Sequence, residues 1–157
     1  MTKGCEKQIK VALCQRILPE FRVPVWGKLA AISNIALTLF SGAGTKYGSS
    51  MITKQEYSYN SQSLVTIPLL SRNKYRVLHP GLVISVLRGH FDCVISEGLT
   101  YFPNSLMLAI ACRISRIPFI MYEAPPVNEE SNARKVLSPI YRKLSDWIIT
   151  YTNYGKR

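Results

Sequence analysis

The sequence predicts an α/β fold: a Rossmann-like, three-layer domain with a mostly parallel sheet. The main observation is a series of three short apolar runs, residues 92–97, 119–122 and 147–151, separated by two helix-forming segments. Continuous apolar strands that alternate with helices are typical of a parallel sheet covered on both faces. Parallel neighbours need a crossover connection, and such crossovers are right-handed. Residues 91–151 are therefore predicted to form a βαβαβ unit.

The start of the chain is predicted to add two strands to this sheet. Residues 9–14 are short and apolar and predict the first strand, and residues 34–40 predict the second. Pro24 suits the first turn of a helix, because its missing N–H would have no partner there. Residues 25–32 are therefore predicted to form a short helix between the two strands.

The segment 41–63 changes character and is predicted to be a loop. It is rich in Gly, Ser, Tyr and Lys. Its glycines do not have the spacing of a dinucleotide-binding loop, and no Gly-Lys-Ser/Thr ends it as in a P-loop. Beyond it, residues 63–67 predict a third strand, residues 75–78 a short extended segment, and residues 80–89 a helix.

Two more helices are predicted in the second half of the chain. Residues 104–114 are apolar on nearly every face and predict a buried helix, which Pro118 ends. Residues 132–147 predict an amphipathic helix whose apolar stripe follows helical spacing. That stripe consists of Leu137, Ile140, Tyr141 and Leu144. Because Pro139 lies inside this segment, a start at Ser138 is the alternative.

The composition indicates one domain with a basic surface. The chain has 157 residues, of which 47% are hydrophobic, enough for one buried core. Its 20 Lys and Arg against 9 Asp and Glu give a net charge of +11. Such an excess favours anionic partners, namely phosphates, nucleic acid or anionic lipid headgroups. A solvated basic surface without a partner is the alternative.

The cysteines and histidines show no metal-ligand pattern. The four cysteines are Cys5, Cys14, Cys93 and Cys112. They lack the close pairing of a zinc or redox motif, and Cys14, Cys93 and Cys112 are predicted to be buried as small apolar side chains. His79 and His90 have no neighbouring ligand at a metal spacing and are predicted to be turn residues. We therefore expect no metal site.

The sequence shows neither a secretion signal nor a membrane span. Residues 1–10 are polar and lack the apolar core of a signal peptide. No apolar run approaches the roughly 20 residues that a spanning helix needs. Free thiols are typical of a reducing compartment. We expect a cytoplasmic protein, with peripheral contact between its basic helix faces and the inner membrane surface as a further expectation.

Candidate site residues follow the predicted strands, because parallel sheets bind ligands beyond the carboxyl ends of their strands. Glu123 is the candidate catalytic residue, since a carboxylate at the end of a strand can accept a proton from a substrate hydroxyl or hydrogen-bond to it. A solvated loop acid is the alternative. Glu97 and Gly98 follow a second strand, and Gly98 suits a turn with an unusual backbone angle.

Three more residues complete the candidate set. Arg16 and Arg22 follow the first strand, and a guanidinium binds phosphate through two parallel hydrogen bonds. Surface arginines are common, so a solvated role is the alternative. Asn153 ends the last predicted strand, where a helix cap is the alternative to a binding role.

Several segments together resemble the amino-terminal half of a family 4 type glycosyltransferase. They are residues 11–16, 19–24, 91–98, 111–118 and 145–151. The resemblance implies a GT-B enzyme, in which two Rossmann-like domains face each other across a cleft. The amino-terminal domain mainly binds the acceptor, and the carboxyl-terminal domain mainly binds the nucleotide-sugar donor.

On that resemblance, residues 1–157 are the acceptor half of a longer enzyme, truncated before the donor domain and inactive alone. The implied partner is a sugar or lipid-linked glycan, with an anionic membrane surface nearby. No cofactor is expected on this half, because the nucleotide sugar would bind the missing one. The chain departs from the family in two places. Glu20 to Pro24 stands where many members have a Gly-rich turn, and Glu123 stands where many have a histidine.

The alternative hypothesis is a stand-alone, basic α/β module that binds a nucleotide or nucleic acid. Its support is the net charge of +11. Against a nucleic-acid partner, the sequence has no specific nucleic-acid motif and no strip of aromatic side chains for base stacking.

Overall fold

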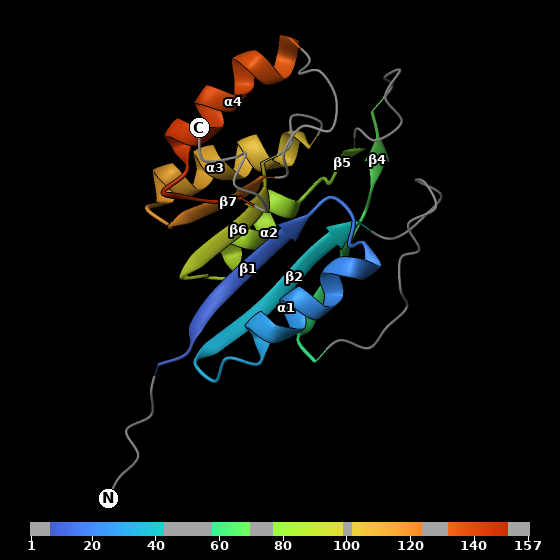
Figure 1. The fold of residues 1–157 in the computed structure, drawn as a ribbon, viewed down its shortest axis with the longest axis vertical. Coiled ribbons are helices and arrows are strands. Elements are labelled where there is room, and N and C mark those ends of the chain that lie inside the picture. The colour runs from blue at the N-terminus through green and yellow to red at the C-terminus, as the bar shows by residue number, and fades with distance from the viewer. Residues whose placement is uncertain (1–6, 43–57, 70–76, 99–101, 124–131, 151–157) are drawn as a thin grey trace, which may run out of the picture.

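The computed structural model describes residues 7–42, 58–69, 77–98, 102–123 and 132–150 (Figure 1). Its centre is a six-stranded parallel sheet in the order β3-β2-β1-β6-β7-β8. The strands are β1 (Ile9–Gln15), β2 (Ile35–Gly42), β3 (Asn60–Leu64), β6 (Cys93–Glu97), β7 (Phe119–Glu123) and β8 (Trp147–Thr150). The predicted fold class, a Rossmann-like α/β domain with three layers, is confirmed.

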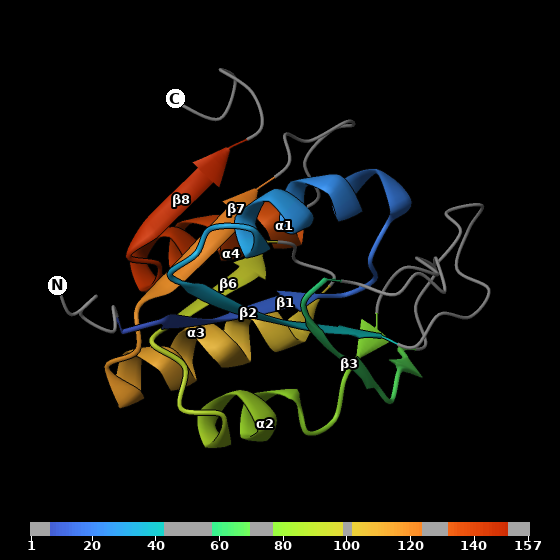
Figure 2. The same cartoon turned by 90° about the horizontal axis from the view of Figure 1, so that it is seen from below.

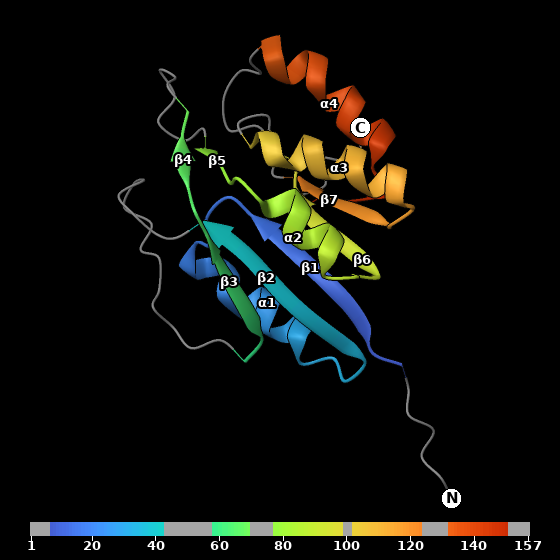
Figure 3. The same cartoon turned by 180° about the vertical axis from the view of Figure 1, so that it is seen from behind.

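Helices cover both faces of this sheet. A 3-10 turn, η1 (Glu20–Arg22), leads into α1 (Val23–Ala30), which packs on one face (Figure 2). On the other face lie α2 (Leu82–Arg88), α3 (Pro103–Ser115) and α4 (Asn132–Leu144) (Figure 3). Each face has its own core. Leu13, Leu39 and Trp26 belong to the core under α1, whereas Phe40, Leu108 and Phe119 belong to the core under α2, α3 and α4.

Strand β1 is central because it pairs with β2 on one side and β6 on the other. Val11 lies opposite Leu37 and also opposite Cys93. Its residues from Val11 to Gln15 are all buried, which explains why the strand is apolar without alternation.

The predicted third strand was misplaced. Residues 63–67 contain the end of β3, a break and the start of β4 (Ile67–Pro68), which pairs antiparallel with β5 (Val77–Leu78). Residues 60–63 of β3 are polar and exposed, so no apolar pattern marks this edge strand. Its backbone pairing with β2 places it in the sheet. Residues 43–57 of the predicted loop lie outside the described residues.

Helix α3 differs from the prediction of a helix buried all round. Met107, Ile110 and Ile114 are exposed, whereas Asn104 and Ser105 are buried against the sheet. The apolar residues do not reveal the buried face, because the two polar side chains find partners there: Asn104 bonds to the backbone of His79, and Ser105 accepts a hydrogen bond from Ser96 at 3.1 Å.

Helix α4 continues through Pro139, so a start at Ser138 was wrong. Tyr141 is buried in the core, and Leu137 and Leu144 pack against it. Ile140 is exposed despite its place in the predicted stripe. The helix ends at Leu144, earlier than predicted, because Trp147 already begins β8.

Two further points concern the thiols and the membrane. Cys14 and Cys112 are buried as predicted, but Cys93 is only partly buried, and all three are free thiols. In the described part of the chain, no helix is long and apolar enough to cross a membrane.

Candidate functional site

Four polar side chains meet at the carboxyl edge of the sheet. We call them the edge cluster: Gln15 at the end of β1, Arg22 in η1, Glu97 at the end of β6 and Tyr122 in β7. Arg22 forms an ion pair with Glu97, and its Nη1 donates a hydrogen bond to the Tyr122 hydroxyl at 3.1 Å. Its guanidinium also lies 5.1 Å from the centre of the Tyr122 ring.

Gln15 completes the hydrogen bonding of the edge cluster. In the amide orientation that satisfies its neighbours, its oxygen accepts from the Tyr122 hydroxyl at 3.3 Å and from Trp26 Nε1. A series of hydrogen bonds therefore runs from Arg22 through the Tyr122 hydroxyl to Gln15. These hydrogen bonds, together with the strands that carry the residues, hold side chains that are far apart in the sequence in one arrangement.

The ion pair of the edge cluster is almost removed from solvent. The exposed fraction is 2% for the Glu97 side chain and 13% for that of Arg22. Glu97 also accepts a long hydrogen bond of 3.4 Å from the backbone N of Arg16. Two charges taken out of water cost several kcal/mol each, and a well-packed apolar pair is often as stable. The ion pair therefore stabilises the folded protein little more than a well-packed apolar pair would.

Glu123, the expected catalytic residue, lies apart from the edge cluster. Side chains alternate along a strand, so Glu123 shares the α3 and α4 side of β7 with Met121, and Tyr122 faces α1. Glu123 is buried, and its Oε2 accepts from Nη2 of Arg142 at 3.5 Å. It is therefore not a solvated loop acid, and it and Glu97 point to opposite faces of the sheet.

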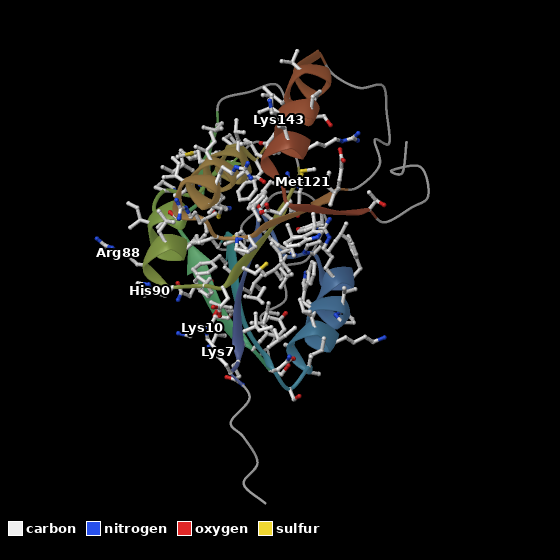
Figure 4. All side chains as sticks on the ribbon, turned by 90° about the vertical axis from the view of Figure 1, so that its left-hand side faces the viewer. Lys7, Lys10, Arg88, His90, Met121 and Lys143 are labelled. Carbon is white, nitrogen blue, oxygen red and sulfur yellow. The ribbon has the colours of Figure 1, made fainter. Side chains whose placement is uncertain are left out.

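Gly98 is required by packing and not by its backbone angle. Among the described glycines only Gly81 has a positive φ, so the expected unusual angle at Gly98 was wrong. A Cβ at Gly98 would lie 2.5 Å from Sδ of Met121, a buried side chain between sheet and helices (Figure 4). The Gly98 N–H also donates to the Tyr122 carbonyl at 2.9 Å. The glycine leaves room for the Met121 side chain beside the end of β6.

His79 is a buried polar residue that the sequence analysis missed. It was predicted to be a turn residue, but it is completely buried. Its Nε2 lies 3.0 Å from the carbonyl oxygen of Arg16, and its Nδ1 lies 3.3 Å from that of Val65. Burial lowers the pKa of His79, and its hydrogen bonds to these carbonyls oppose that shift. The polar Asn104 in an apolar helix was the available signal for this site.

Asn104 and Gly42 hold His79 in place. The Asn104 side chain accepts from the His79 N–H at 2.8 Å and donates to the His79 carbonyl at 2.9 Å. Gly42 makes room, because a Cβ there would lie 2.6 Å from Cε1 of His79 and 2.8 Å from the Arg16 carbonyl oxygen. His79 thus joins the end of β1 to the segment after β3.

The expected site residues are therefore only partly brought together. Arg16, Arg22, Glu97 and Gly98 lie at the carboxyl edge near β1, β6 and β7. Glu123 ends β7 at the same edge but faces the other side. Asn153 lies outside the described residues. Within those residues, no group of three His, Cys, Asp or Glu could hold a metal ion.

Comparison with known proteins supports the fold. The sequence matches no family model and no curated protein. Among solved structures, the chain is similar to the crystal structure of a phenylacrylic acid decarboxylase from Aquifex aeolicus. The sequence identity is 12%, the TM-score is 0.51, and the match covers 96% of this chain and 86% of that chain. At this identity the likeness shows a shared α/β fold alone.

These comparisons overturn the expected resemblance to family 4 type glycosyltransferases. The solved structure named above is that of a phenylacrylic acid decarboxylase, and these findings give no support to a GT-B enzyme, an acceptor half or a role in glycan biosynthesis. The expected glycan acceptor and the expected separate donor domain were based on that resemblance alone, so they are no longer supported.

The residues behind the resemblance explain the error, because they hold strands together. Asp92 Oδ2 accepts from the Lys10 N–H at 2.9 Å, and Asp146 Oδ2 accepts from the Phe119 N–H at 2.8 Å. Both aspartates lie at the amino ends of strands, away from the carboxyl edge of the sheet. A parallel sheet of this kind can use such residues whatever its function.

Proposed function

We propose that this chain is a ligand-binding α/β domain whose site lies at the carboxyl edge of β1, β6 and β7. The observation that carries the proposal is the edge cluster, with its nearly buried Arg22–Glu97 ion pair. Such a pair adds little to stability, and it lies where parallel sheets bind their ligands. Charged groups held in a defined geometry at that edge favour a binding role.

The ligand class that we propose is a small phosphate-bearing molecule of the nucleotide type. Arg16 directly follows β1 and Arg22 lies in η1, the next element of the chain. A guanidinium matches the geometry of phosphate oxygens. Glu97 orients Arg22 by pairing with it, so Glu97 acts as a positioning residue. The net charge of +11 raises the local concentration of anions.

The experiment compares thermal unfolding with adenosine, AMP, ADP and inorganic pyrophosphate. A ligand that binds the native state at a concentration of 100 Kd adds about 2.7 kcal/mol, which is roughly 5–10 °C for a domain of this size. We expect a shift with AMP, ADP and pyrophosphate but none with adenosine. Equal shifts with adenosine and AMP would contradict a phosphate contact.

A matched pair of variants locates the site. Arg16→Gln removes a guanidinium at the carboxyl edge, and Arg88→Gln removes one from the end of α2, on the outer surface (Figure 4). We expect only the first variant to reduce the shift with ADP. A short single-stranded DNA is the second arm. A stabilisation by DNA that exceeds that of ADP and vanishes as salt rises would replace the nucleotide with nucleic acid as the partner.

A further inference from the structure

A hollow of about 400 Å³ opens at the opposite, amino edge of the sheet. It lies between the end of α3 and the starts of β7 and β8, and Arg113, Arg116, Asp146 and Trp147 are among its lining residues. Small-molecule sites in proteins typically measure about 300–1,000 Å³. The hollow is therefore large enough for a small organic ligand.

Arg116 occupies a backbone conformation that normally belongs to glycine. It caps the end of α3 with φ 57° and ψ 33°, in the left-handed region. Glycine is the usual residue after a helix in that conformation, and a side chain there costs about 1 kcal/mol. A strained residue at the mouth of a hollow points to a use for its side chain.

The charged side chains that line the hollow carry a net positive charge, which an anionic ligand could balance. Asp146 is fixed by the Phe119 N–H, which donates to Oδ2 at 2.8 Å. Its Oδ1 lies 3.9 Å from Nη1 of Arg113, so these two charges face each other. Arg116 is exposed and adds a second guanidinium to the lining. Two guanidinium groups and one carboxylate give a net charge of +1.

The rest of the lining is apolar and includes an exposed indole ring. The exposed fraction of Trp147 is 59%, although the residue begins a strand of the central sheet. Ile117 and Pro118 form part of the wall. Burial raises the pKa of the Cys112 thiol to about 12, so this thiol stays uncharged at neutral pH. An aromatic ring stacked on Trp147 would cover apolar surface that now faces water.

We propose that this hollow binds a small aromatic carboxylate. The carboxylate accepts hydrogen bonds from Arg116 and Arg113, because a guanidinium fork matches its two oxygens. The ring of the ligand packs on Trp147, between the end of α3 and the edge strand β8. This site lies at the opposite edge from the edge cluster, so it does not depend on the function proposed above.

The test uses biphenyl-4-carboxylate as the probe and tryptophan fluorescence as the readout. The chain has two tryptophans, and Trp26 is buried with an exposed fraction of 7%. A change in emission that is lost in the Trp147→Phe variant therefore reports on Trp147 and not on Trp26. Biphenyl-4-carboxamide has the same rings without the charge, and acetate has the charge without the rings. We expect a saturable change with the carboxylate alone.

Arg116→Gly is the decisive variant, because it favours the backbone while it removes the guanidinium. We expect its unfolding temperature to stay the same or rise, and its affinity for the probe to fall at least tenfold. Arg113→Gln should also weaken binding, whereas Arg88→Gln, on α2 outside the hollow, should bind as wild type does.

Three results would overturn the proposal. They are an absence of any saturable emission change, equal binding of the carboxamide, and unchanged affinity in both Arg116→Gly and Arg113→Gln. Isothermal titration calorimetry on the wild type and Arg116→Gly repeats the comparison without a fluorescent readout, so that quenching by the probe in solution is recognised.

Discussion

Arg22 and Glu97 form an ion pair across 75 positions of the sequence and join η1 to the end of β6. This ion pair lies at the carboxyl edge of the sheet, on the face that α1 covers. It places two charges where water is nearly absent, beside the hydroxyl of Tyr122.

Glu97→Gln should destabilise the protein by about 3 kcal/mol, because it leaves the largely buried Arg22 without its counter-charge. Urea unfolding measures this as a lower midpoint with an unchanged slope. The matched control is Lys7→Gln, which breaks the pair with Asp92, where the Lys7 side chain has an exposed fraction of 89%. The control should change stability by less than about 1 kcal/mol. Equal effects of the two variants would contradict the importance of burial.

Two glycine substitutions should act in opposite directions. Gly42→Ala places a Cβ 2.8 Å from the backbone oxygen of Arg16 and 2.6 Å from His79, so we expect a loss of roughly 1–3 kcal/mol. Gly27→Ala in α1 meets no atom within 4 Å, and Ala in a helix is better than Gly by about 0.5–1 kcal/mol. Thermal unfolding of both variants checks the signs. A stable Gly42→Ala protein would show that the His79 region rearranges easily.

The free energy of unfolding should rise with pH in the weakly acidic range because of His79. Burial lowers the pKa of this side chain from its ordinary value of 6.5; the carbonyls of Arg16 and Val65 and the charge of Glu97 oppose the shift, and the charge of Arg16 adds to it. Between the lowered pKa and 6.5, the unfolded chain binds more protons than the folded one. The contribution of His79 to the free energy of unfolding is therefore fully present above pH 6.5, and it is lost as the pH falls through this window.

The comparison of wild type with His79→Gln measures that contribution. Urea unfolding at several pH values should show a smaller pH dependence in the variant, whatever its overall stability. An identical dependence in both proteins would assign the effect to other groups.

Asn104→Leu should cost about 2–3 kcal/mol even though it makes α3 more apolar. The variant leaves the buried N–H and carbonyl of His79 without the side chain that now pairs with both. Ile114→Ala on the same helix is the control, since Ile114 has an exposed fraction of 78% and should lose less than about 0.5 kcal/mol. A harmless Asn104→Leu substitution would mean that water or another group replaces the amide.

The polar contacts of His79 and Glu97 could not be found from the sequence. Pro80 after His79 favoured a turn. No neighbouring residue in the sequence indicates that the carbonyl oxygens of Arg16 and Val65 lie against the imidazole ring of His79. Glu97 was recognised as a strand-end carboxylate, but its partner Arg22 was considered only as a phosphate ligand. Contacts between residues 63 or 75 positions apart depend on how the strands are ordered, which local pattern does not encode.

The sequence by itself determined the α/β class and five of the six parallel strands, because buried strands such as β1, β6 and β7 must be continuously apolar. It could not locate β3, whose exposed polar residues pair through the backbone alone. Only the tertiary structure decided that Glu97 faces Arg22 while Glu123 faces Arg142 on the other side of the sheet. The physical reason is that a side chain's face follows from strand register, and its partner follows from the order of strands in space.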